Sequence, residues 1–178
     1  KTYNLSPSAL ESKLEKAEKA GCLPKVVVPV HFAGQACDMV GIHRLSQHYG
    51  FKVVEDASHS FGGTYRKEVV GNCLYSDITI LSFHAIKTIT TGEGGIALTN
   101  DLKLADRLAR LRSHGITRDS ANMLHDSPGA RYYEQIDLGF NFRMTDLAAA
   151  LGINQMKRLY EFIDRRRQIA DIYRKELD

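Results

Sequence analysis

Two hydrophobic patterns alternate along the chain and predict its secondary structure. Residues 26–31 form a short, continuously apolar and β-branched run, which is typical of a strand covered on both faces. Met39, Ile42, Leu45 and Tyr49 instead follow the helical period. A second apolar strand follows this helix, so that strand, helix and strand lie within about thirty residues, which is the spacing of a βαβ unit with parallel strands.

Capping residues mark the ends of the predicted helices. Ser6 and Pro7 suit the start of a first helix that Gly21 can end, and Asp38 and Gly50 suit the start and end of the second. We expect further strands at 52–56, 78–83 and 95–99, a helix at 101–112, a long ordered loop at 113–142 and a long helix from 145 through 159. These elements predict an α/β fold with a mainly parallel central sheet.

Composition and charge exclude several classes of partner. The 178 residues carry a formal net charge of only +3, and basic residues are interleaved with acids, which argues against nucleic-acid binding. The basic run at 165–167 is interpreted as a solvated helix face. No apolar run approaches the roughly 20 residues that span a bilayer, and His43 and His48 lack metal-site spacing. Three cysteines without CxxC spacing favour a cytoplasmic protein with reduced thiols.

Reactive side chains follow two of the predicted strands. Asp56 closes the strand at 52–56, with His59 three residues later, and Ser82 and Lys87 follow the strand at 78–83. In parallel α/β sheets, functional groups collect at the carboxyl ends of strands. A lysine that forms an imine, a carboxylate that pairs with a ring nitrogen and a hydroxyl that donates to a phosphate are the groups that pyridoxal 5'-phosphate (PLP) needs. From these residues alone, a turn-forming Asp56 and a surface Lys87 stay open as interpretations.

Longer motifs carry a resemblance to a known family. They comprise residues 29–35, 55–59, 82–95, 112–115 and 139–146. In this order they resemble the signature segments of the DegT/DnrJ/EryC1/StrS family of PLP-dependent sugar aminotransferases. The likeness covers nearly the whole chain. It implies a three-layer α/β fold, that of the large domain of fold type I PLP-transferases.

The resemblance also implies the domain organisation. Residues 1–160 would be the central part of the PLP-binding large domain, and residues 161–178 a helix leading toward a C-terminal small domain. Because the sequence ends inside a helical pattern without a C-cap glycine, we expect an incomplete chain. The family's phosphate-binding turn and the aromatic residue that stacks on PLP would lie before Lys1, so we expect these 178 residues alone to bind PLP weakly.

Roles for five residues follow from the resemblance. Lys87 would be the catalytic lysine that carries PLP as a Schiff base, and Asp56 the partner of the pyridine nitrogen. His59 would approach the ring face or its phenolic oxygen, and Ser82 would bind the phosphate. Asn141 would reach the phosphate from the neighbouring subunit, which implies a homodimer with a shared active site.

The implied reaction moves an amino group from L-glutamate to C4 of a nucleotide-linked 4-keto-6-deoxy sugar. Residues 30–35 and 112–119 look most like the enzymes that aminate UDP-linked HexNAc sugars on the route to pseudaminic acid. Residues 82–90 look equally like the branch that makes 4-amino-4-deoxy-L-arabinose for lipid A. A PLP-dependent dehydratase and a non-catalytic domain that binds sugar nucleotides also stay open, and the presence of Lys87 favours transamination over both.

Overall fold

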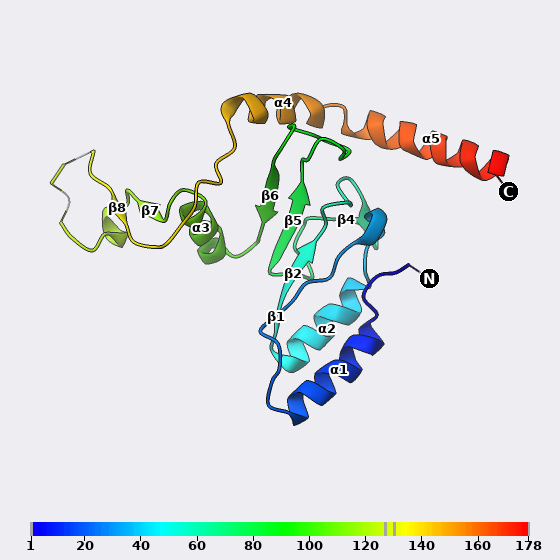
Figure 1. Cartoon of the computed structure of the whole chain (residues 1–178), viewed down its shortest axis with the longest axis horizontal. Coiled ribbons are helices and arrows are strands. Elements are labelled where there is room, and N and C mark those ends of the chain that lie inside the picture. The colour runs from blue at the N-terminus through cyan, green and yellow to red at the C-terminus, as the bar shows by residue number, and fades with distance from the viewer. Residues whose placement is uncertain (1, 127, 130, 178) are drawn as a thin grey trace. The chain divides into compact units, whose positions relative to one another are not determined.

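The computed structural model describes residues 2–126, 128–129 and 131–177. They fall into two units, of which the first combines residues 1–100 with 146–178 and the second comprises residues 101–145 (Figure 1).

A four-stranded sheet organises the first unit. Its strands are β1 (Val26–Val27), β2 (Lys52–Asp56), β5 (Ile78–Ser82) and β6 (Gly95–Leu98), in the order β1-β2-β5-β6. The first three are parallel, and β6 runs antiparallel to β5. The predicted α/β class with a mainly parallel sheet is therefore confirmed.

Two helices and the sheet enclose the core of the first unit. These are α1 (Pro7–Lys19) and α2 (Met39–Tyr49), whose ends match the predicted caps. Ser6 accepts a hydrogen bond from the Ala9 N–H, and Gly50 ends α2 with a φ of 77°. The buried apolar residues of this core are Leu10, Leu14, Cys37, Met39, Ile42, Leu45, Phe51 and Val53.

The predicted strand at 26–31 is shorter than expected. Only Val26–Val27 pair regularly with β2, and Val30 adds an isolated bridge to Asp56. Pro29 has no N–H to donate, although its carbonyl accepts the Asp56 N–H at 2.9 Å. Val28 and Val30 remain 52% and 43% exposed, so the expectation of a strand covered on both faces is wrong for the described residues.

Short elements connect the strands of the first unit. The turn η1 (Phe32–Gly34) follows β1, and the hairpin of β3 (Thr64–Tyr65) and β4 (Glu68–Val69) lies between β2 and β5.

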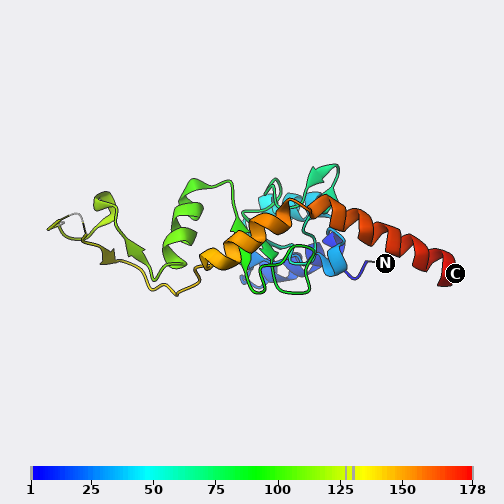
Figure 2. The same cartoon turned by 90° about the horizontal axis from the view of Figure 1, so that it is seen from above.

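The long helix predicted from residue 145 is two helices. They are α4 (Asp146–Met156) and α5 (Leu159–Leu177), and a tight turn separates them, in which the Arg158 N–H donates to the Gln155 carbonyl. Both views show α4 and the first turns of α5 passing over the sheet edge at which β5 ends, while the rest of α5 extends beyond the sheet (Figures 1 and 2). No helix of the described residues is long and apolar enough to cross a membrane.

The second unit contains α3 and the loop predicted at 113–142, of which residues 127 and 130 lie outside the described residues. Its elements are α3 (Leu102–Leu111), β7 (Ile116–Thr117), η2 (Ser120–Asn122) and β8 (Glu134–Gln135), with β7 and β8 antiparallel. Asp101 caps α3 as its sequence position suggests. Glu134 is buried and accepts hydrogen bonds from the backbone N–H groups of Leu124 and His125 and from the Tyr132 hydroxyl, so it ties the loop to β8.

Candidate active site

The carboxyl ends of β2 and β5 lie side by side. Asp56 pairs with Ile80 in parallel register, and the next residue, Ala57, donates its N–H to the Ile80 carbonyl at 2.9 Å. Asp56 Oδ1 accepts the Ser58 N–H at 3.1 Å, which orients this carboxylate. Ser82 ends β5, and its Oγ accepts the His84 N–H at 3.3 Å, so the hydroxyl hydrogen can still be donated.

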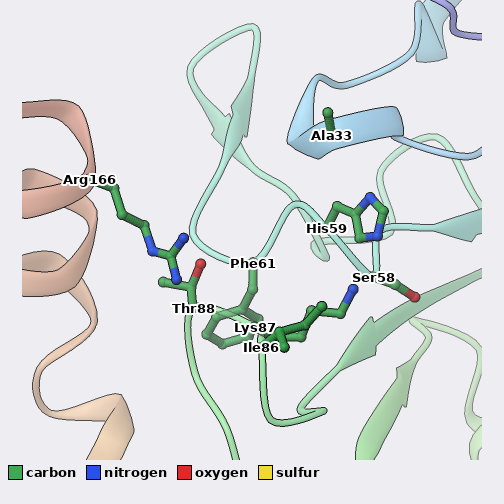
Figure 3. A pocket seen from close by; sticks show the side chains of 8 residues that line it. All are labelled: Ala33, Ser58, His59, Phe61, Ile86, Lys87, Thr88 and Arg166. Atoms are coloured by element: carbon green, nitrogen blue, oxygen red, sulfur yellow. The ribbon is translucent and has the colours of Figure 1, made fainter. Parts of the chain in front are cut away.

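A cavity of about 230 Å³ opens beside these strand ends. It is lined by Ala33, Ser58, His59, Phe61, Ile86, Lys87, Thr88 and Arg166. Figure 3 shows Lys87 and His59 directed into the same space from two loops, with Ser58 beside them. The structure thus brings two of the predicted site residues together. Asp56 and Ser82 end the neighbouring strands but do not line the cavity.

The loop that carries Lys87 is fixed at its base. Thr91 donates its N–H to the Phe83 carbonyl at 2.9 Å, which closes the loop, and Ile89 is only 1% exposed. The Phe83 ring meets the Phe61 ring edge-to-face at 5.7 Å. Lys87 is therefore half-buried in a loop whose two ends are anchored.

A buried polar network, which the sequence did not reveal, supports the end of β2 from the other face. His31 is fully buried, and its Nε2 lies 2.7 Å from Glu55 Oε1. Glu55 Oε2 accepts hydrogen bonds from the hydroxyls of Ser76 at 2.9 Å and Thr79 at 2.8 Å. Because side chains alternate along a strand, Glu55 and the neighbouring Asp56 point to opposite faces. A histidine that ends an apolar run and an acid inside a second strand were the signals in the sequence.

The partners in this network shift each other's protonation. Burial disfavours the charged ring, but hydrogen bonds with the Cys37 side chain and Glu55 outweigh it and raise the pKa of His31 to about 9. Burial also disfavours the Glu55 carboxylate, yet hydrogen bonds from His31, Thr79 and Ser76 outweigh it and lower the pKa of Glu55. These two pKa shifts favour a charged His31–Glu55 pair at neutral pH, whereas the Cys37 backbone N–H, which donates to His31 Nδ1 at 3.3 Å, requires a neutral ring; the pH dependence of stability distinguishes the two states.

Asn141 belongs to the second unit. Its backbone pairs with Ser113, and the adjacent Phe142 donates its N–H to the Arg112 carbonyl at 2.9 Å. The predicted contact of Asn141 with a phosphate in a neighbouring subunit stays a prediction. Among the residues that the structure describes, no group of three or more His, Cys, Asp or Glu side chains could hold a metal ion.

Comparison with known proteins places this chain in a family. The profile of the DegT/DnrJ/EryC1/StrS aminotransferase family matches residues 1–178. The chain belongs to this family. The resemblance stated from the sequence motifs is thereby confirmed.

Three relatives illustrate the breadth of this aminotransferase family. The spore coat polysaccharide biosynthesis protein SpsC of Bacillus subtilis is 41% identical over 97% of this chain and 42% of its own length. The UDP-4-amino-4,6-dideoxy-N-acetyl-β-L-altrosamine transaminase of Campylobacter jejuni is 38% identical over 98% of this chain and 43% of its own. Among solved structures, Helicobacter pylori PseC, an aminotransferase involved in the biosynthesis of pseudaminic acid, matches 97% of this chain and 42% of its own with a TM-score of 0.84 and 29% identity.

These matches confirm the predicted fold of a PLP-transferase large domain. The chain spans less than half the length of each of these relatives. The residue roles inherited from the family motifs, and the boundary predicted at residues 160 and 161, stay predictions. Residue 161 itself lies inside α5.

The buried pair predicts a specific pH dependence of stability. The stabilisation that comes from protonated His31 is fully present below the ordinary pKa of 6.5 and is lost as the pH rises to about 9. The Glu55 contribution is present above 4.5 and is lost as the pH falls through the lowered pKa. We expect Glu55→Gln to reduce the free energy of unfolding by about 3 kcal/mol, the usual cost of breaking a buried pair. The difference in the free energy of unfolding between the wild type and Glu55→Gln should be largest between pH 4.5 and 6.5 and should shrink toward about pH 9.

Denaturant unfolding at a series of pH values measures this difference. Glu176→Gln, at an exposed position of α5, is the matched control and should give a difference close to zero at every pH. A pH-independent loss in Glu55→Gln would contradict the ion pair and leave only neutral hydrogen bonds.

Proposed function

We propose that the full-length protein is a PLP-dependent sugar-nucleotide aminotransferase, with L-glutamate as amino donor and C4 of a nucleotide-linked 4-keto-6-deoxy sugar as acceptor. Aminotransferases of this family are PLP-dependent. The observation that carries the proposal is the shared cavity of Lys87 and His59 beside the strand end of Asp56.

The residues present fit this cofactor. The cavity offers a primary amine at Lys87, and none of the described residues that line it is acidic, which suits an anionic, phosphate-bearing molecule. A carboxylate at Asp56 and a hydroxyl at Ser82 end the adjacent strands β2 and β5. When bound, PLP would supply an electron sink for the cleavage of a bond at the amino-bearing carbon.

Each side chain has a definite task in this proposal. The Lys87 amine would hold the cofactor covalently and, when free, would accept and return a proton at Nζ. Asp56 would pair with the ring nitrogen of the cofactor and favour its protonated form through a charge-assisted hydrogen bond. His59 would contact the ring face or its phenolic oxygen, and Ser82 would donate its hydroxyl hydrogen to the phosphate.

A second subunit completes the proposed site. The family motif at 139–146 supports Asn141 as a residue that would donate a hydrogen bond to the cofactor phosphate in the neighbouring subunit, which would make the active form a homodimer with shared sites. We place this enzyme in the cytoplasm, where nucleotide sugars and L-glutamate would be its small-molecule partners.

The relatives support a UDP-linked HexNAc sugar as the acceptor. One of them is named for a UDP-linked 4-amino sugar and another for pseudaminic acid biosynthesis. The second candidate is the UDP-linked 4-keto pentose that leads to 4-amino-4-deoxy-L-arabinose, and the motif at 82–90 favours it equally. A non-catalytic sugar-nucleotide-binding domain would have no use for a cofactor-bearing lysine at position 87.

Replacing the lysine tests the reaction class. We expect the full-length protein with PLP to show the visible absorption band of a lysine-linked cofactor, and Lys87→Ala to lose both this band and turnover, the latter by about 10³-fold or more. Lys13→Ala, on the exposed surface of α1, is the control and should keep both. An unchanged spectrum in Lys87→Ala would rule out this assignment.

A charge-neutral replacement tests the role of Asp56. Asp56→Asn keeps an acceptor for the Ser58 N–H but removes the negative charge. We expect turnover to fall about 10²-fold or more while the melting temperature changes little, because the charge acts on the cofactor and not on folding. Asp106→Asn on α3 should alter neither quantity. A parallel loss of stability and turnover would instead make Asp56 a structural residue.

A substrate panel tests the acceptor. With L-glutamate as donor, we expect kcat/KM for a UDP-linked 4-keto-6-deoxy HexNAc to exceed that for the UDP-linked 4-keto pentose and for dTDP-linked 4-keto sugars by at least about 10-fold. A preference for the pentose would favour the second candidate.

A further inference from the structure

Arg166 is the middle member of three successive arginines on α5, and its surroundings differ from those of its neighbours. Arg165 donates to the Gln168 side chain at 3.2 Å, and Arg167 lies 3.4 Å from Asp164. Within the described part of the chain, the structure records no acidic partner for Arg166. Figure 3 shows its guanidinium group extending to Thr88 on the wall of the Lys87 cavity. All three arginines are exposed, which agrees with the interpretation of this run as a solvated helix face, but Arg166 also lines the Lys87 cavity.

Packing of α5 fixes the direction of Arg166. Gly62 has a φ of +79°, and a Cβ at this position would lie 2.4 Å from Ile163 Cδ1 and 3.2 Å from Leu159 Cδ1. The absence of that atom lets the first turns of α5 approach the loop after β2. Ile163 and Arg166 are three residues apart and share one face of the helix. Contact at Gly62 therefore turns Arg166 toward the cavity.

The cavity has an unbalanced charge. Lys87 and Arg166 have basic side chains, and none of the described lining residues is acidic. A second hollow of about 370 Å³ shares Ala33, His59, Phe61 and Arg166 with the first and adds Arg167. Arg166 thus stands where the Lys87 cavity meets further open space, and a ligand larger than the cofactor would pass it.

We propose that Arg166 is a substrate-binding residue that recognises a carboxylate or phosphate oxyanion of the molecule that reacts beside Lys87. This inference rests on the proposed function. Guanidinium groups bind both anions through paired N–H donors. The oxyanion comes either from the dicarboxylate amino donor or from the diphosphate of the nucleotide sugar. The cofactor phosphate is assigned to Ser82 at the end of β5, and Figure 3 shows Arg166 entering from the side opposite His59 and Ser58.

Separate half-reactions of the full-length holoenzyme distinguish the two sources. The change in the cofactor spectrum is followed in single turnovers with L-glutamate alone, and then with the 4-keto sugar nucleotide and the aminated enzyme. We expect Arg166→Ala to raise the half-saturating concentration for one of these substrates about 10- to 100-fold, the range for a lost hydrogen bond to a charged group, and to leave the other unchanged. Arg166→Lys should restore part of the affinity, and Arg165→Ala should match the wild type.

Direct binding gives a readout that does not depend on turnover. Calorimetric titration with uridine diphosphate and with glutarate should show weaker binding of one of them to Arg166→Ala than to the wild type. Unchanged affinities in both assays would overturn the inference. Loss of bound PLP in Arg166→Ala would also overturn it, because Arg166 would then hold the cofactor. Absence of the cofactor absorption band in the wild type would contradict the proposed function. A normal band in the wild type, together with substrate affinities in Arg166→Ala that equal those of the wild type, would contradict only this inference.

Discussion

Parallel pairing of β2 with β5 is the constraint on which the site depends. Because Asp56 lies opposite Ile80, the two strands end at one edge, and the loops that leave them carry His59 and Lys87 into one cavity. If the pairing of β2 with β5 slipped by one residue, Asp56 would move to the face with the buried network and Glu55 to the opposite face. The buried contact of Glu55 with His31, Ser76 and Thr79 opposes such a slip, so a polar network on one face holds the register of the reactive edge on the other.

Packing supplies what the register alone does not. Burial of Ile89 and the Phe61–Phe83 ring contact hold the Lys87 loop against the strand ends. Because Gly62 has no side chain, α5 can pack close to the loop beside the cavity. The cavity is consequently bounded by residues from three separate stretches of the chain, at 33, at 58–61 and at 86–88, and by Arg166. Fixed loops with solvent-accessible basic groups are the arrangement expected of a preorganised site for an anionic cofactor and substrate.

Local patterns predicted the helices and strands that depend on local forces. Caps at Ser6 and Asp38 and the apolar runs of β2 and β5 were recognised because each acts within a few residues. Pro29 interrupted β1, and the turn before α5 was missed because no proline or glycine marks it. The His31–Glu55 pair joins residues 24 positions apart, and the cavity position of Arg166 depends on Gly62, so both required tertiary structure. The roles of Lys87, Asp56, His59, Ser82 and Asn141 came from family motifs and remain to be measured.

The central claim is that Lys87 forms the covalent link to the cofactor. Borohydride reduction of the full-length protein with PLP, followed by peptide mass spectrometry, measures this directly, because reduction makes such a link permanent. The account predicts one phosphopyridoxyl adduct per subunit, on the peptide that contains Lys87. An adduct confined to another lysine, or no adduct at a concentration of PLP that gives a visible absorption band, would contradict it.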